Sequence, residues 1–207
     1  NILFSMGNKL IEFGYEVCVV ICDNTNNDIL YDVSEKITIF NIAGDDYKKK
    51  LNLWQKVRRV MSRNRNAIHT YEESITDMYI SSKLSPIIHE VEPNLIITFS
   101  TDATRILYYY IDVQCPTITM QHGDPDIILD KLTVRTLDAL NKTEYIQVLM
   151  ESFINKSSQK TNISKKKFIR IPNPVPQYDI TSDKKENIIT CISRVDGSKM
   201  QHLIIEA

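Results

Sequence analysis

Short apolar runs separated by segments of helical spacing recur along most of this chain of 207 residues. The run Tyr15–Cys22 is rich in β-branched residues, as is typical of a strand buried on both faces of a parallel sheet. Alternation or continuous apolar character predicts five further strands. We expect these strands at 36–42, 94–99, 116–121, 145–150 and 167–171.

Helical spacing of apolar residues fills the segments between these strands. Helices are expected at 1–13, 47–65, 72–90, 104–112, 132–141 and 151–160. Pro86 lies inside the third of them and is expected to kink or split it, because proline removes one backbone hydrogen bond. Strands that alternate with helices predict an α/β fold, a Rossmann-like doubly wound parallel sheet.

A break in the pattern falls at Pro172–Pro176, where three of five residues are proline. Neither a helix nor a sheet continues through such a segment, because proline fixes φ and lacks an N–H donor. We therefore expect one domain over residues 1–171, a hinge over 172–186, and the start of a second domain over 187–207. A single strand–helix unit cannot bury its own faces, so 187–207 either packs on the first domain or belongs to a larger one.

Composition excludes several classes of protein. The formal net charge of -1 argues against nucleic acid as the main partner, since phosphate binding over a large face requires a basic excess. No apolar run approaches the ~20 residues that span a bilayer. Cys18 and Cys22 lie about 13 Å apart along one expected strand, too far for a disulfide, and no metal-ligand spacing is present. Reduced thiols and a cytoplasmic location are expected.

Arg194 and Lys199 lie where an apolar run (187–192) ends and a helical pattern begins. A strand, a short turn and a helix start place these two cations beside free backbone N–H groups, an arrangement that attracts a phosphate or diphosphate. Arginine and lysine at the end of a strand are also commonly just solvated.

Several segments together resemble landmarks of the retaining glycosyltransferases of family 4, in that family's order. They are Asn8–Ile21 with its Gly-Tyr-Glu-Val piece, Pro93–Phe99, Cys115–His122, Ile171-Pro-Asn-Pro-Val175, and the Arg194 and Lys199 pair. The resemblance implies a GT-B fold, of which this chain is the N-terminal, acceptor-side domain plus the first strand and helix of the donor domain. The family's first strand and Gly-rich loop are expected before residue 1. Its E-x7-E motif is expected after residue 207.

The resemblance also implies an activity: metal-independent transfer of a hexose from a UDP- or GDP-sugar to a glycan or lipid-linked acceptor, with retention. No cofactor is expected. Arg194 and Lys199 would bind the donor diphosphate, and His122 would approach the donor sugar as the catalytic residue. The fragment alone is expected to be nearly inactive. The alternative is a Rossmann-like module that binds a nucleotide or a partner without catalysis.

Four neighbours of the expected strand ends are weaker candidates for the cleft or the acceptor site. Gly123 permits close backbone approach, and Asp124 either accepts a hydroxyl or forms an ordinary turn before Pro125. Thr101 and Asp102 follow the strand 94–99, where such residues most often cap the next helix.

A basic stretch over residues 48–65 carries eight cations and no acid. One interpretation is a surface helix that packs its apolar side on the sheet. The other is that its basic side lies on anionic lipid at the inner face of the membrane, where each cation adds about 1 kcal/mol. The candidates for such contact are Lys48, Lys49, Lys50, Trp54, Lys56, Arg58, Arg59 and Arg63.

Overall fold

The computed structural model describes residues 2–22, 32–42, 53–54, 56–57 and 71–174. The chain divides into two compact units, 1–174 and 175–207. The second unit lies outside the described residues, as does most of the hinge expected over 172–186. The start of a second domain at residue 187 therefore stays a prediction.

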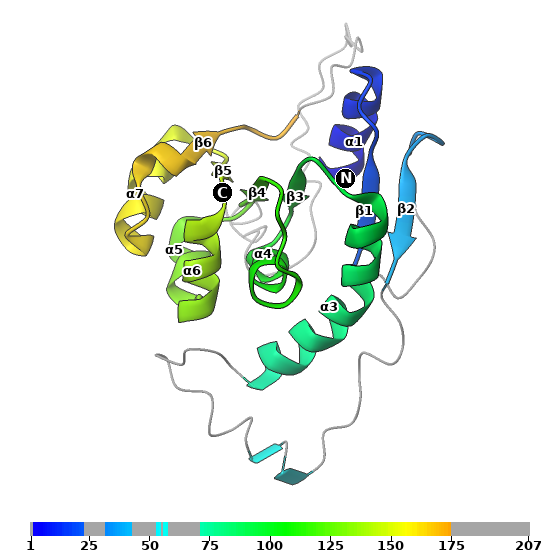
Figure 1. Ribbon diagram of the computed structural model, residues 1–207. Helices are drawn as coiled ribbons and strands as arrows, with labels where there is room; N and C mark the ends of the chain where they lie inside the picture. Colours follow the sequence, from blue (N-terminus) through cyan, green and yellow to red (C-terminus); the bar gives the residue numbers. More distant parts are fainter. Residues whose placement is uncertain (1, 23–31, 43–52, 55, 58–70, 175–207) are drawn as a thin grey trace, which may run out of the picture. The chain divides into compact units, whose positions relative to one another are not determined.

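The fold is α/β with parallel strands, as the sequence pattern predicted (Figure 1). In the described part of the chain the strands form two sheets. The first pairs β1 (Cys18–Ile21) with β2 (Thr38–Asn41), and Cys18 lies opposite Thr38. The second has the order β3-β4-β5-β6. Its strands are β3 (Ile96–Thr98), β4 (Thr117–Met120), β5 (Tyr145–Val148) and β6 (Phe168–Arg170).

Helices connect the strands in the alternation expected from the sequence. The α-helices are α1 (Ile2–Glu12), α3 (Tyr71–Val91), α4 (Thr101–Ile106), α5 (Pro125–Ile128), α6 (Val134–Lys142) and α7 (Glu151–Thr161). A π-helix (Leu107–Ile111) extends α4, and short 3-10 helices cover Leu129–Lys131 and Lys165–Lys167. Among the described helices, none combines the length and apolarity needed to cross a bilayer.

Helices α1 and α3 cover opposite faces of β1. Val19 and Ile21 belong to the apolar cluster that contains Phe4 of α1. Val20 belongs instead to the cluster that contains Ile80 of α3. Because successive residues of a strand point to opposite faces, the two helices lie on the two sides of this sheet. Double winding thus follows from the β-branched run that contains β1.

Pro86 was expected to kink or split its helix, and the split does not occur, because α3 continues from Tyr71 to Val91. Pro86 and Ser82 are both exposed, so the carbonyl of Ser82, which loses its donor at Pro86, faces water. A second difference concerns α4, which begins at Thr101 rather than at Thr104. The side chain of Ser100 caps it by accepting a hydrogen bond from the backbone N–H of Ala103 at 3.1 Å.

Hydroxyl groups join α4 to the sheet beneath it. The buried side chains of Thr98 in β3, Thr104 in α4 and Thr119 in β4 are hydrogen-bonded to one another, with oxygen–oxygen distances of 2.7, 2.8 and 3.2 Å. Each of these three hydroxyls therefore has a hydrogen-bond partner, which offsets the cost of removing it from water. These contacts fix α4, and with it the loop that follows β3.

Candidate functional site

The carboxyl edge of the second sheet brings together three residues from three chain segments. Phe99 follows β3, His122 follows β4, and Asn173 follows β6. The rings of Phe99 and His122 stack, with centroids 5.6 Å apart and planes inclined by 12°. The imidazole Nδ1 of His122 lies 3.2 Å from the side-chain oxygen of Asn173. Ligands of open α/β sheets bind at this edge.

The contact with Asn173 sets the hydrogen-bonding character of His122. An amide oxygen only accepts, so Nδ1 must carry the proton and donate. In neutral imidazole the other nitrogen, Nε2, is then an acceptor. This Nε2 is buried and has no hydrogen-bond partner among the described residues. A buried polar atom without a partner costs about 1–3 kcal/mol, which marks Nε2 as a place where a further group is expected.

Gln147, fully buried in β5, holds the two segments that carry His122 and Asn173. Its side-chain oxygen accepts a hydrogen bond from the backbone N–H of Gln121 at 3.1 Å. Its side-chain nitrogen donates to the backbone carbonyl of Ile171. One side chain in an inner strand of the sheet therefore links the residue before His122 to the residue two positions before Asn173. Gln147 positions the pair.

Gly123 and Asp124 have packing roles in the described structure. A Cβ atom added to Gly123 would lie 2.2 Å from Cδ1 of Ile128, so glycine permits close approach of the loop to α5. The carboxylate of Asp124 caps α5 by accepting from the N–H of Asp126 at 2.9 Å. Of the two roles left open for Asp124, the structure shows turn and capping chemistry. Within the described residues, neither Gly123 nor Asp124 is hydrogen-bonded to the side chain of His122.

Asp102 and Thr101 belong to the first turn of α4, next to the cap formed by Ser100. The carboxylate of Asp102 is largely exposed and pairs with the guanidinium of Arg105 at 2.7 Å. Thr101 is half-buried at the first helical position. The residues at the start of α4 therefore cap the helix or form an ion pair within it, and capping is the role that such residues most often have after a strand.

Most of the remaining candidates lie outside the described residues. They are Arg194 and Lys199 of the diphosphate site and Lys48, Lys49, Lys50, Arg58, Arg59 and Arg63 of the basic stretch. Trp54 and Lys56 are helical and exposed. Leu53, Trp54 and Val57 are 76%, 78% and 44% exposed. One interpretation of this stretch was a surface helix that packs its apolar side on the sheet. The apolar residues of its described part are exposed instead.

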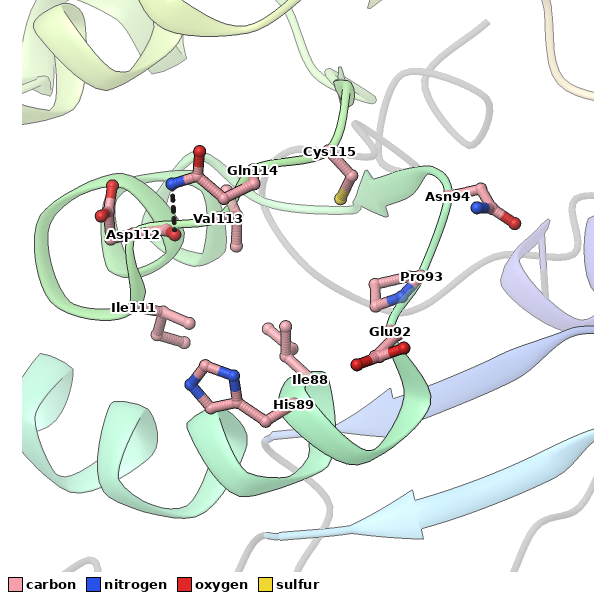
Figure 2. Close-up of a pocket in the computed structure, with 10 residues that line it drawn as sticks. All are labelled: Ile88, His89, Glu92, Pro93, Asn94, Ile111, Asp112, Val113, Gln114 and Cys115. Atoms are coloured by element: carbon pink, nitrogen blue, oxygen red, sulfur yellow. Dashed lines mark hydrogen bonds between the residues drawn. The ribbon is translucent and has the colours of Figure 1, made fainter.

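A hollow of about 490 Å³ lies at the opposite edge of the sheet, where β3 and β4 begin. Figure 2 shows it bordered by the end of α3, with His89 and Glu92, and by the loop before β4, with Gln114 and Cys115. Gln114 spans this loop by donating to the backbone carbonyl of Asp112 at 3.2 Å. Within the described ranges, no group of three or more His, Cys, Asp and Glu side chains is arranged to hold a metal ion.

Sequence reasoning missed three contributors to the site: Phe99, Gln147 and Asn173. Asn173 lies inside the Ile-Pro-Asn-Pro-Val segment, which was interpreted only as a hinge. A polar residue inside the apolar run 145–150 was the available signal for Gln147, because a buried amide must find hydrogen-bond partners.

Compared with known proteins, the chain matches no family model, no curated protein and no solved structure.

Proposed function

We propose that the protein is a retaining glycosyltransferase that transfers a hexose from a nucleotide-sugar to a glycan or lipid-linked acceptor in the synthesis of surface polysaccharide, lipopolysaccharide or glycolipid. The observation that carries the proposal is the pairing of His122 with Asn173 at the carboxyl edge of the sheet. The family resemblance assigns the strand before His122 to the cleft and the segment of Asn173 to the interdomain hinge. Side chains from both landmarks are in hydrogen-bond contact, which supports reading them as parts of one site.

His122 would act through Nε2. With Nδ1 donating to Asn173, Nε2 is available to accept a hydrogen bond from a sugar hydroxyl. Stacking on Phe99 restricts the tilt of the ring, and Asn173 restricts its rotation. A group held in this way loses little entropy when the substrate binds, and it orients the reacting hydroxyl or the donor sugar.

The donor's charge would be balanced by Arg194, Lys199 and the helix start beside them. As the bond between the anomeric carbon and the β-phosphate oxygen breaks, the nucleoside diphosphate leaves with the bonding electron pair. The acceptor oxygen forms the new bond to the anomeric carbon on the same face, and its proton passes to the departing phosphate. Two cations and backbone N–H groups stabilise the leaving charge without a metal ion.

A lipid-linked acceptor gives the basic stretch a role. The exposed Trp54 and Lys56 belong to a segment whose cations would rest on an anionic membrane surface at the cytoplasmic side. This docking would bring the acceptor domain to its substrate. Nucleic acid is not proposed as a partner.

The test is nucleotide release by the natural full-length protein from a panel of UDP- and GDP-sugars in the presence of EDTA. The proposal expects release from one donor class and its loss in Arg194→Ala, by about 10²-fold or more for one phosphate contact made in the transition state. Arg135→Ala is the control. It also removes an arginine, but the guanidinium of Arg135 lies over the ring of Tyr109 and is not part of the proposed site, so release should be unchanged. Binding of a nucleotide without release would favour the non-catalytic module instead.

A further inference from the structure

Exposed charges of opposite sign lie at the two ends of the amino edge of the second sheet, the edge where its strands begin. The strand order β3-β4-β5-β6 places β3 and β6 at opposite ends, as Figure 1 shows. Three inter-strand spacings of about 4.8 Å separate these two strands, so the ends lie about 14 Å apart. This distance exceeds the Debye length of about 10 Å in 0.1 M salt, so neither end neutralises the other.

The acidic end lies where α3 stops and β3 begins. Glu90 belongs to the last turn of α3, Glu92 follows that helix, and Asp112 follows the π-helix. All three side chains are exposed. Glu92 and Asp112 border the hollow of about 490 Å³, which Ile88 and Ile111 also line (Figure 2). A partly apolar hollow with carboxylates on its rim suits a lysine side chain, whose stem is apolar and whose tip is a cation.

The basic end is the 3-10 helix directly before β6, which consists of three consecutive lysines. Lys167 is held within the molecule, because its Nζ donates to the backbone carbonyls of Asn141 and Thr143. Successive residues of a 3-10 helix point in directions about 120° apart, so the other two lysines project elsewhere. These two, Lys165 and Lys166, are both exposed. They are therefore the cations that a partner could contact.

The charges at the two ends are not compensated inside the described part of the chain. Among the described residues, no ion pair engages the three acids of the acidic end, Lys165 or Lys166. Glu144, exposed directly before β5, lies between the ends and leaves the basic end with a positive excess. Leu95 and Tyr145, on the same edge, are 45% and 40% exposed. Apolar side chains among separated charges are typical of a protein–protein contact surface.

We propose that the amino edge of the second sheet is an interface between two copies of this chain. A two-fold axis along the sheet normal, passing between β4 and β5, sets the two edges against each other and reverses the strand order. β3 of one copy then faces β6 of its partner, so the acidic end meets the basic end twice. Lys165 or Lys166 of one copy would enter the hollow of the other, beside Glu92 and Asp112. This inference does not depend on the proposed enzymatic activity.

Charge complementarity selects both the axis and the occupant. A two-fold axis along the edge itself would keep the strand order and set like charges against each other, which disfavours that arrangement. An anionic lipid surface would attract Lys165 and Lys166 but repel the acids on the same edge. A basic partner would be attracted at one end and repelled at the other in the same way. A second copy, turned about the sheet normal, is complementary to both ends at once.

Sedimentation velocity of the natural full-length protein provides the first measurement. The expected result at about 50 mM salt is a dimer whose dissociation constant rises at least about tenfold at about 500 mM salt, because screening weakens contacts between exposed charges. A protein that stays monomeric at both salt concentrations up to about 100 μM, or a dimer that salt does not weaken, would overturn the proposal.

Charge reversal in the full-length protein identifies the surface. Lys165→Glu with Lys166→Glu makes both ends acidic, and Glu90→Lys with Glu92→Lys makes both ends basic. Each double variant should self-associate at least about tenfold more weakly than the wild type, because like charges then meet. An equimolar mixture of the two should dimerise within about threefold of the wild type, because every contact again joins opposite charges.

Glu151→Lys is the matched control, because Glu151 is exposed at the start of α7, beyond the carboxyl end of β5. It reverses one charge at the other edge of the sheet and should leave association unchanged. Urea midpoints confirm that all variants are folded. Wild-type association of either double variant, or a mixture that stays monomeric, would overturn the proposal. So would a monomer that binds phosphatidylglycerol vesicles through Lys165 and Lys166, which would assign the basic end to a lipid surface.

Discussion

Arg105 of α4 and Asp77 of α3 form a buried two-point ion pair, with nitrogen–oxygen distances of 2.7 and 2.8 Å. The side chains are 2% and 0% exposed. The remaining guanidinium nitrogen of Arg105 donates to Thr136 of α6 at 2.9 Å and to Asp102 at 2.7 Å. Three helices, α3, α4 and α6, are therefore joined at one cation.

Asp77→Ala should be strongly destabilising. It leaves the Arg105 guanidinium buried with its principal counter-charge removed, and breaking such a pair costs about 3–5 kcal/mol. Urea unfolding of the variant measures the loss. The exposed pair of Asp138 and Lys142, at 2.8 Å, is the control, and Asp138→Ala should cost no more than about 1 kcal/mol. Equal losses at the two sites would contradict the importance of burial. The double variant Asp77→Leu with Arg105→Met should lose less than Asp77→Ala, because no buried charge is left without a partner.

Gly123→Ala should lower stability by about 1–3 kcal/mol through overpacking, since the new methyl group would meet Cδ1 of Ile128. Ile128→Val removes that atom and should recover part of the loss. Gly14→Ala serves as the comparison, because Gly14 has open space around it but a φ of 85°. Its cost comes from backbone strain and should not change with Ile128→Val. A rescue of both glycine variants, or of neither, would refute the steric explanation.

The contribution of Asp138 to stability should disappear in acid. Its hydrogen bond to Lys142, followed by that to Tyr109, holds the pKa of the Asp138 carboxyl below its ordinary value of 3.8. A carboxyl whose pKa is lowered by folding stabilises the protein above its unfolded value, and this stabilisation is lost as pH falls through the folded value. Melting temperatures of the wild type and of Asp138→Asn should therefore differ at neutral pH, and the difference should shrink as pH falls below 3.8 and through the lower pKa of the folded state. A constant difference down to low pH would show that the carboxylate charge is not responsible. Lys142→Met should bring the pKa of Asp138 closer to 3.8, as NMR titration would show.

Under the proposed transferase activity, Asn173→Ala should reduce turnover of the natural full-length protein by about tenfold, the value of one hydrogen bond of about 1–1.5 kcal/mol. Asn173→Asp retains an oxygen that accepts from Nδ1 of His122, so it should retain more activity than Asn173→Ala. If Asn173 only packs within the hinge, the turnover of each variant should instead follow its loss of stability. Urea unfolding of both variants separates these cases, because loss of turnover in Asn173→Ala at unchanged stability indicates that Asn173 positions His122. Equal turnover in Asn173→Ala and Asn173→Asp would contradict positioning by Asn173.

Most of the described strands and helices could be predicted closely because their apolar patterns are local and continuous, although the short helix α5 was not expected. The β-branched run that contains β1 and the apolar run that contains β4 each predict a buried strand without knowledge of any contact. Pro86 was expected to kink or split its helix, and the split did not occur, because Pro86 lies on an exposed helix face where the carbonyl that loses its donor can be solvated. Solvent exposure at one position cannot be read from a local pattern.

The candidate site was only partly predictable. His122 could be placed at the end of a strand from the sequence alone, whereas its contact with Asn173 joins residues 51 positions apart. The pairing of Arg105 with Asp77 spans 28 positions and likewise depends on tertiary packing. Gly123 and Asp124 were chosen for their position beside His122, but local packing and capping decide their roles. Proximity in sequence identifies the right edge of the sheet and does not reveal which side chains meet there.

The most direct test of the central claim is the turnover number of the natural full-length protein and of His122→Ala, measured with the same nucleotide-sugar donor in EDTA. If His122 acts on the reacting groups, the variant should lose about 10²–10⁴-fold in turnover while binding of the nucleoside diphosphate is unchanged. A folded His122→Ala protein with turnover within about twofold of the wild type would contradict the account.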